Sequence, residues 1–328
     1  MLKIKFLPFL LIPICSGCIQ TESSKSSGEV INTAEDASKV TKSNQVISLQ
    51  GSLLPAKQLT AQTRQQRQDQ LEEARKNYES NPEDIENIIW YGRRLAYLGR
   101  YQEAIRIFSI GIDLDDEAYR VFRHRGHRYI TTRKFDEAIV DLQQAAFYAR
   151  IPKNAIEPDG LPNRINLPLT NDKFNIWYHL GIAYYLKGNY DKAISSFKHC
   201  LEFADNDDLL VANVDWFYMT YRKIGNIAAA EELLTLIPER MRIIENFGYR
   251  DRLSLYAGEV DAEDLLDQAK GPDGSLEPTL AYGVANWYLY NGQVPEGEAV
   301  INKILKHYAW DSFGYIAAEA DKVALSHL

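Results

Sequence analysis

The sequence predicts an all-α protein, a solenoid of about six stacked helix pairs. Three stretches share one pattern: IWYGRRLAYLGRYQEAIRIF, FRHRGHRYITTRKFDEAIVDL and IWYHLGIAYYLKGNYDKAISSF. Gly92 and Gly126 are 34 residues apart, and Ala104 and Ala138 are again 34 residues apart. Repeats of this length bury their apolar faces by stacking on one another, which is why they form a solenoid.

Each repeated residue has a structural role. Glycine recurs at position 15 of the 34-residue frame, where the first helix of a pair ends. The backbone is expected to be left-handed there, and glycine adopts that conformation without a steric penalty because it has no Cβ atom. In the second repeat Arg133 takes this place, so we expect its turn to be looser or strained. The alanine at position 20 lets the two helices of a pair approach closely. The turn glycines are Gly99, Gly188, Gly225, Gly258 and Gly292, and the alanines are Ala104, Ala138, Ala193 and Ala230.

The register predicts four clear pairs and two degenerate ones. The alanines at position 20 are 34, 55 and 37 residues apart, and the interval of 55 holds one repeat plus an insertion at about residues 153–173. In the last two pairs Glu263 and Gly297 stand where alanine is expected. The expected parts are a polar N-terminal capping helix within residues 61–84, a solenoid over residues 85–328, and within it a final capping segment at 310–325.

These features resemble the tetratricopeptide repeat, a helix–turn–helix unit of 34 residues. The resemblance implies a right-handed solenoid with a concave groove for a protein or peptide partner. The segments RHRGHRY, EPDGLPN and IWYHLGIAYYLKG are also similar to a group of uncharacterised bacterial tetratricopeptide lipoproteins, a similarity that brings no known activity. The carboxylate clamp of the chaperone-binding branch does not transfer, because Ile89 and His124 stand where lysine and asparagine belong.

The N-terminus predicts a lipoprotein signal peptide at residues 1–17. Two lysines precede a nine-residue apolar run, which is too short to span a bilayer. The Ser-Gly-Cys that ends at Cys18 resembles a bacterial lipobox, which implies lipidation of Cys18, although Cys15 stands where leucine is usual. From residue 18 to residue 60 apolar side chains are scattered, so we expect a flexible tether of roughly 35 Å. The implied location is the bacterial cell envelope, with the outer membrane favoured over the inner.

Composition and motifs exclude other classes of function. The net charge of −8 gives no general affinity for nucleic acid. The chain lacks the common catalytic and nucleotide-binding motifs, so we expect no enzyme and no cofactor. Arginines around His124 and His127 disfavour a metal ion. Cys200 falls on a small packing position, so we expect a buried structural thiol.

The second repeat carries the sharpest chemical signal. Between residues 119 and 134 there are six arginines or lysines, two histidines and no acid. The family's frame implies that Arg93, Arg120, Arg123 and His127 face the groove. Arginine forks suit carboxylates and phosphates, so the first hypothesis is an anion site for an acidic segment of a partner. The alternative is that the acids at 113–117 pair with these arginines.

Further along the groove the frame places Tyr178 and Tyr185 in the third repeat and Arg222 and Lys223 in the fourth. A face that is basic, then aromatic, then basic suits an extended peptide with acidic and apolar side chains. The insertion at 153–173 is either a passive bridge over the groove edge or a flap that contacts the partner.

The predicted function is therefore a membrane-anchored scaffold of the cell envelope that binds a protein or peptide partner. The alternative is a glycan or small-ligand binding component of an outer-membrane uptake system. Stacked tryptophans on an exposed face would favour the glycan alternative. Trp90, Trp177 and Trp287 instead fall within repeat helices, where we expect them to belong to the core.

Overall fold

The computed structural model describes residues 45–326, so the expected signal peptide, Cys18 and the first part of the tether lie outside the described residues. These described residues belong to one compact unit. They form fourteen helices, and the β-structure among them is limited to three isolated bridges. The all-α prediction is confirmed.

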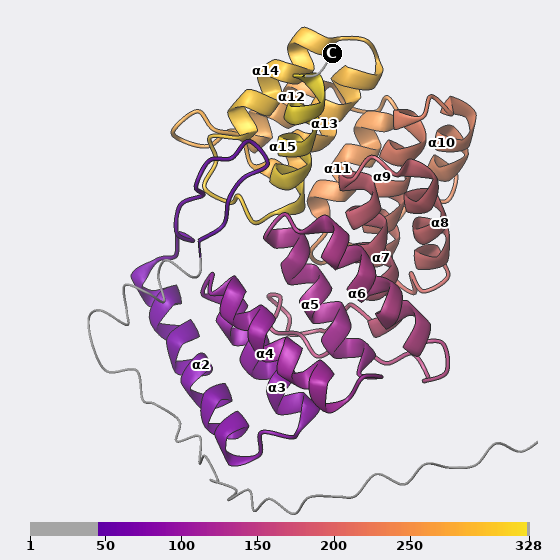
Figure 1. The fold of residues 1–328 in the computed structure, drawn as a ribbon. Coiled ribbons are helices and arrows are strands. Elements are labelled where there is room, and N and C mark those ends of the chain that lie inside the picture. The colour runs from indigo at the N-terminus through magenta and orange to yellow at the C-terminus, as the bar shows by residue number, and fades with distance from the viewer. Residues whose placement is uncertain (1–44, 327–328) are drawn as a thin grey trace, which may run out of the picture. The chain divides into compact units, whose positions relative to one another are not determined.

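Twelve of the helices form six consecutive pairs, with one further helix at each end (Figure 1). The N-terminal helix is α2 (Ala61–Ser80), and the C-terminal helix is α15 (Phe313–Leu325). The predicted solenoid of six pairs is confirmed. The pairs are α3 (Ile85–Tyr97) with α4 (Tyr101–Leu114), α5 (Tyr119–Thr131) with α6 (Phe135–Tyr148), α7 (Asp172–Leu186) with α8 (Tyr190–Leu201), α9 (Asp207–Lys223) with α10 (Ile227–Leu234), α11 (Phe247–Tyr256) with α12 (Ala262–Ala269), and α13 (Pro278–Tyr290) with α14 (Val294–Ile304).

The turns and contacts of the pairs follow the repeated residues. The five expected turn glycines all have a left-handed backbone, with φ between 71° and 81°. Arg133 has φ 64° at the same place, so its turn keeps the shape of the others at a cost in strain. The position-20 alanines are fully buried, and Cys200 is buried as predicted. A Cβ atom at Gly92 would lie 2.4 Å from the Phe108 ring, which explains why the repeat has glycine at this position.

Residues 45–60 are packed against the solenoid, which corrects the predicted tether over this part of the chain. Val46 is buried, and the Leu49 N–H donates to Glu319 Oε1 at 2.8 Å. The indole N–H of Trp310 donates to the Pro55 carbonyl at 2.9 Å. These bonds lie close to α15, and in Figure 1 the indigo segment lies next to the yellow helices. Apolar burial and backbone pairing at this site offset the cost of ordering the segment.

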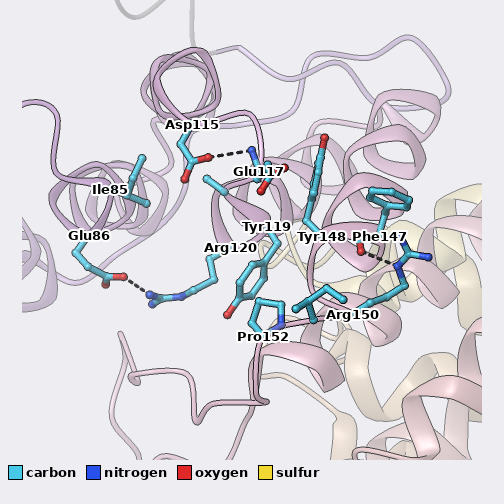
Figure 2. Close-up of a pocket in the computed structure, with 12 residues that line it drawn as sticks. Ile85, Glu86, Asp115, Glu117, Tyr119, Arg120, Phe147, Tyr148, Arg150 and Pro152 are labelled. Atoms are coloured by element: carbon cyan, nitrogen blue, oxygen red, sulfur yellow. Dashed lines mark hydrogen bonds and ion pairs between the residues drawn. The ribbon is translucent and has the colours of Figure 1, made fainter.

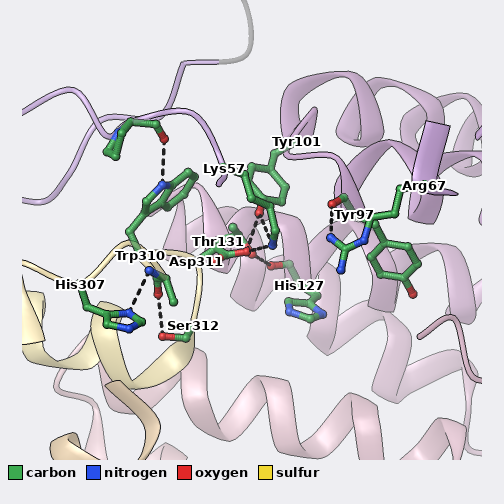
Figure 3. Close-up of polar contacts among 12 residues, drawn as sticks. Lys57, Arg67, Tyr97, Tyr101, His127, Thr131, His307, Trp310, Asp311 and Ser312 are labelled. Atoms are coloured by element: carbon green, nitrogen blue, oxygen red, sulfur yellow. Dashed lines mark hydrogen bonds and ion pairs between the residues drawn. The ribbon is translucent and has the colours of Figure 1, made fainter. Parts of the chain in front are cut away.

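The C-terminal helix does more than cap the open end of the solenoid. It packs against α13 and α14, and it also packs against α7 of the third repeat, while α13 contacts α9. The loop before α15 reaches the first repeats, because Asp311 accepts from the Tyr101 hydroxyl at 2.8 Å and pairs with Lys57 (Figure 3). The last helices therefore cover part of the face that the sequence predicted to be an open groove.

Candidate functional site

A small cavity lies between the first two helix pairs and the insertion, and we name it the arginine pocket. Its volume is about 130 Å³. Two of its arginines, Arg123 and Arg128, project from α5, and Arg93 projects from α3. The lining residues are Arg93, Ala96, Tyr97, Phe108, Arg123, His124, His127, Arg128 and Glu157.

The structure brings three of the four predicted cationic residues, Arg93, Arg123 and His127, to this pocket. Arg93 and Arg123 are both more than nine-tenths buried. The His127 ring lies 4.3 Å from the ring of His179 and 5.3 Å from the ring of Phe313, measured between centroids. His127 therefore packs against α7 and α15.

The insertion supplies a counter-ion that the sequence analysis missed. Glu157 is 5% exposed, and its Oε2 lies 3.1 Å from Arg123 Nη2 and accepts from Asn175 Nδ2 at 2.9 Å. Its Oε1 lies 3.7 Å from Arg93 Nη2. The carboxylate beside these two arginines thus comes from the insertion. The alternative hypothesis had instead assigned the acids at 113–117 as partners of the arginines. The one available signal was an acid directly before the Pro-Asp-Gly turn of the insertion.

The turn of the insertion lies against the inner face of the first pair. Arg94 Nη1 donates to the Gly160 carbonyl at 2.8 Å. A Cβ atom at Gly160 would lie 1.9 Å from the Tyr97 hydroxyl and 2.7 Å from Arg93 Nη2, so only glycine allows this approach. An isolated bridge between Ile156 and Asn171 closes the base of the insertion. The insertion thus packs against α3 and α5, where the sequence predicted either a passive bridge over the groove edge or a flap that contacts the partner.

The arginine pocket holds more positive than negative charge. Three arginines line it, against the single carboxylate of Glu157. Burial and the neighbouring arginines lower the pKa of His124 and of His127 well below the usual histidine value, so both rings are neutral. Arg93 Nη1 and Arg123 Nε are buried and have no hydrogen-bond partner within the described residues, 45–326. Buried donors without a partner are rare in proteins and call for a physical explanation.

Arg120, the fourth predicted residue, lies outside the arginine pocket. It pairs with Glu86, and its Nε lies 3.7 Å from Asp172 Oδ1. It lines a separate cleft of about 610 Å³, in which Phe147 and Arg150 form the far wall (Figure 2). The predicted cationic set is thus divided between two sites, because Arg120 has counter-ions of its own.

The predicted aromatic part of the groove is covered, which corrects the expectation of an open face there. Tyr178 donates to the Tyr249 hydroxyl at 3.1 Å, and the hydroxyls of Tyr185 and Tyr282 lie 2.7 Å apart. Asn286 also donates to the Tyr185 hydroxyl, at 2.8 Å. Both predicted tyrosines are buried under α11, α13 and α15, since their hydroxyls find partners on or beside these helices.

The basic residues of the fourth repeat also have partners within the chain. Arg222 Nη2 donates to Asn291 Oδ1 at 2.9 Å, and its guanidinium lies 4.0 Å from the Tyr290 ring centroid. Lys223 Nζ lies 2.8 Å from Asp321 Oδ1. These contacts hold the C-terminal helices against α9, so neither side chain is available to a peptide in this arrangement.

Two further observations on residues 45–326 concern other kinds of site. No cluster of histidine, cysteine, aspartate or glutamate in that range could hold a metal ion. None of the helices described is both long enough and apolar enough to cross a membrane.

Comparisons with known proteins agree with the repeated helix pairs. The family profile described as Tetratricopeptide repeat matches residues 174–207, which is the span that the 34-residue frame assigns to the third repeat. The BBSome complex member BBS4 of Bos taurus is 24% identical over 140 residues, which cover 42% of this chain and 22% of that relative. The match therefore spans about a fifth of the relative's length.

Among solved structures, a MamA structure (AMB-1) gives a TM-score of 0.40 at 18% identity, covering 52% of this chain and 88% of that one. YrrB, described as a TPR protein with an unusual peptide-binding site, gives a TM-score of 0.41 at 15% identity, covering 76% of this chain and 97% of that one. The matched repeat at 174–207 overlaps one of the six consecutive helix pairs, so the chain carries a tetratricopeptide repeat within its helical solenoid.

Proposed function

We propose that the protein is a lipid-anchored scaffold of the bacterial cell envelope. In this proposal it binds a protein segment that carries acidic and apolar side chains. The apolar side chains of that segment lie on the insertion, next to the arginine pocket. Tetratricopeptide repeats present surfaces for protein partners, so the fold supports the general role of a scaffold.

The observation that carries the proposal is the exposure of apolar side chains on the insertion. Ile156 is 68% exposed and Leu161 is 48% exposed. They flank Glu157 and Gly160, the two residues that contact the arginine pocket. Contiguous exposed apolar side chains on a soluble surface mark interaction sites. The others in or directly before the insertion are Phe147, Ile151, Ile165 and Leu167.

This arrangement favours the partner-contacting flap over the passive bridge. A passive connection gains nothing from exposed isoleucine and leucine, whereas a binding surface gains the burial of their apolar area. The glycan alternative has less support. Trp90, Trp177 and Trp287 are half-buried in three different helices, α3, α7 and α13, where they cannot form a common platform for a sugar.

The test is capture of the partner by the full chain in its native membranes, with covalent cross-linking and quantitative mass spectrometry. The double change Ile156→Ser and Leu161→Ser should abolish enrichment of the proteins captured by the wild type. The matched control is Val140→Ser, an exposed apolar residue on α6 that lies outside the insertion. Equal enrichment by the double variant and the wild type would refute the proposal.

A further inference from the structure

We propose that the arginine pocket is a binding site for one oxyanion, carried by a carboxylate or a phosphoryl group, which lies beside Glu157 and does not replace it. The inference rests on the proposed function, because it names the chemical group of the partner that this site receives. It adds Arg128 and Tyr97 to the binding residues and gives Glu157 the role of setting the affinity.

The first argument is charge. The pocket is lined by three guanidinium groups and one carboxylate. Within residues 45–326, Arg128 forms no ion pair, and its guanidinium lies 5.6 Å from the centroid of the Tyr101 ring. Arginine stays protonated in proteins, so the excess of two positive charges cannot be removed by deprotonation. Buried charges require partners, and an anion from outside the chain would supply one.

The second argument is the set of donors that Glu157 leaves unused. Glu157 engages Arg123 through Nη2 and Arg93 through Nη2. The atoms without a partner are different ones, Arg93 Nη1 and Arg123 Nε. An oxyanion that accepts from these nitrogens therefore adds contacts without breaking those of Glu157. Arginine forks bind planar carboxylates and tetrahedral phosphates through two N–H groups at once.

The third argument is space. A water molecule takes up about 30 Å³ of liquid volume. The cavity of about 130 Å³ therefore has room for a carboxylate or phosphate head group. Tyr97 also lines the cavity, and its hydroxyl accepts from Arg93 Nε at 3.2 Å and can donate its own proton to an anion. His124 and His127 are neutral, so they do not add to the charge that the anion must balance.

The test is titration of the full chain in detergent with inorganic phosphate and, separately, with N-acetylglutamate. Thermal melting and calorimetry report binding, and sodium chloride of equal ionic strength is the reference. Arg128→Gln should lose the anion-dependent rise in melting temperature, since it removes one charge without depriving Glu157 of a partner. Arg106→Gln, an exposed arginine on α4, should keep the rise. Glu157→Gln should tighten binding by about tenfold, because it removes a nearby negative charge.

The two probes also identify the source of the group. Tighter binding of N-acetylglutamate assigns the site to an acidic side chain of the partner, and tighter binding of phosphate assigns it to a phosphoryl group. Equal stabilisation by both anions and chloride, or an unchanged response in Arg128→Gln, would overturn the inference. If the wild type binds no oxyanion but the Ile156→Ser, Leu161→Ser variant still loses partner capture, this inference alone is wrong. If the wild type binds an oxyanion but captures no partner, the proposed function alone is wrong.

Discussion

Arg133, in the turn of the second repeat, donates to Glu319 of the C-terminal helix α15 at 2.9 Å. The two side chains are 4% and 2% exposed. Arg133 also donates to the Trp310 carbonyl at 2.9 Å, and the other Glu319 oxygen accepts from Leu49. The residue that breaks the glycine pattern of the turns thus joins the second repeat, the C-terminal helix and the segment at 45–60. Its strained backbone is retained because the side chain makes this connection.

Replacing Arg133 should therefore separate the cost of the lost ion pair from the relief of backbone strain. Arg133→Ala and Arg133→Gly both leave Glu319 buried without its cation, which costs about 3–5 kcal/mol. The glycine variant should be less destabilised than the alanine variant by about 1–2 kcal/mol, since only alanine keeps a Cβ at positive φ. Urea unfolding measures the stability of both variants.

The matched control is Gly188→Ala. A Cβ atom there would meet nothing within 4 Å, so the change carries only the cost of a Cβ at positive φ. Equal stability of wild type and Arg133→Gly would contradict the ion-pair role.

The stability of the protein should fall as the pH falls below about 6.5, the ordinary histidine pKa. Burial and nearby arginines lower the pKa of His124, His127 and His179 in the folded state. The unfolded chain therefore binds more protons than the folded chain between the lowered and the ordinary pKa. Protonation favours unfolding in this window, by about 1.4 kcal/mol for each pKa unit of each histidine.

Urea unfolding at pH 7.5 and pH 5.5 measures this effect. His127→Phe should lose less stability between the two values than the wild type does, because the ring that packs on Phe313 is kept without a titrating group. His199→Gln, at an exposed position, is the control for removing a histidine elsewhere in the chain. An identical pH dependence in His127→Phe and the wild type would show that this ring does not contribute.

Gly160→Ala should release the insertion from the arginine pocket. The added Cβ would overlap the Tyr97 hydroxyl, so the turn must move away. Hydrogen exchange over residues 153–171 should speed up by more than about tenfold, while exchange in α9 stays unchanged. Gly248→Ala is the control, since its Cβ would meet Thr279 at an ordinary distance of 3.7 Å. Unchanged exchange over the insertion would mean that the close approach of Gly160 is not required.

Cys18→Ala should release the protein from the membrane fraction and abolish labelling by a fatty-acid probe. Acyl chains anchor a protein by the burial of their methylene groups, and stable anchoring takes more than one chain. Fractionation and metabolic labelling of wild type and variant measure this. Membrane retention of the variant, together with no labelling of the wild type, would rule out the lipid anchor.

The helix pairs could be predicted because glycine and alanine recur at fixed spacing for local reasons. Turn geometry decides the glycines, and the contact within a pair decides the alanines. The strained turn at Arg133 followed from the same rule. The position of Glu157 in the arginine pocket could not be predicted, because the insertion has no sequence period from which its path could be inferred.

The covering of the predicted groove was missed for a related reason. Tyr185 and Tyr282 lie close in the fold but 97 residues apart in the chain. The repeat frame describes contacts between neighbouring pairs and says nothing about a later pair that folds back on an earlier one. The frame therefore assigns inner-face positions without showing which of them the chain itself covers.

The most direct test of the central claim is site-specific photo-cross-linking from position 161 in living cells. A photoreactive amino acid at Leu161, beside the arginine pocket, should cross-link to one partner segment, which mass spectrometry then identifies. The account predicts an aspartate, glutamate or phosphorylated residue within a few residues of the cross-link. It also predicts loss of the cross-link in Arg128→Gln and its retention in Arg106→Gln. A cross-linked segment without an anionic group, formed equally well in Arg128→Gln, would contradict the account.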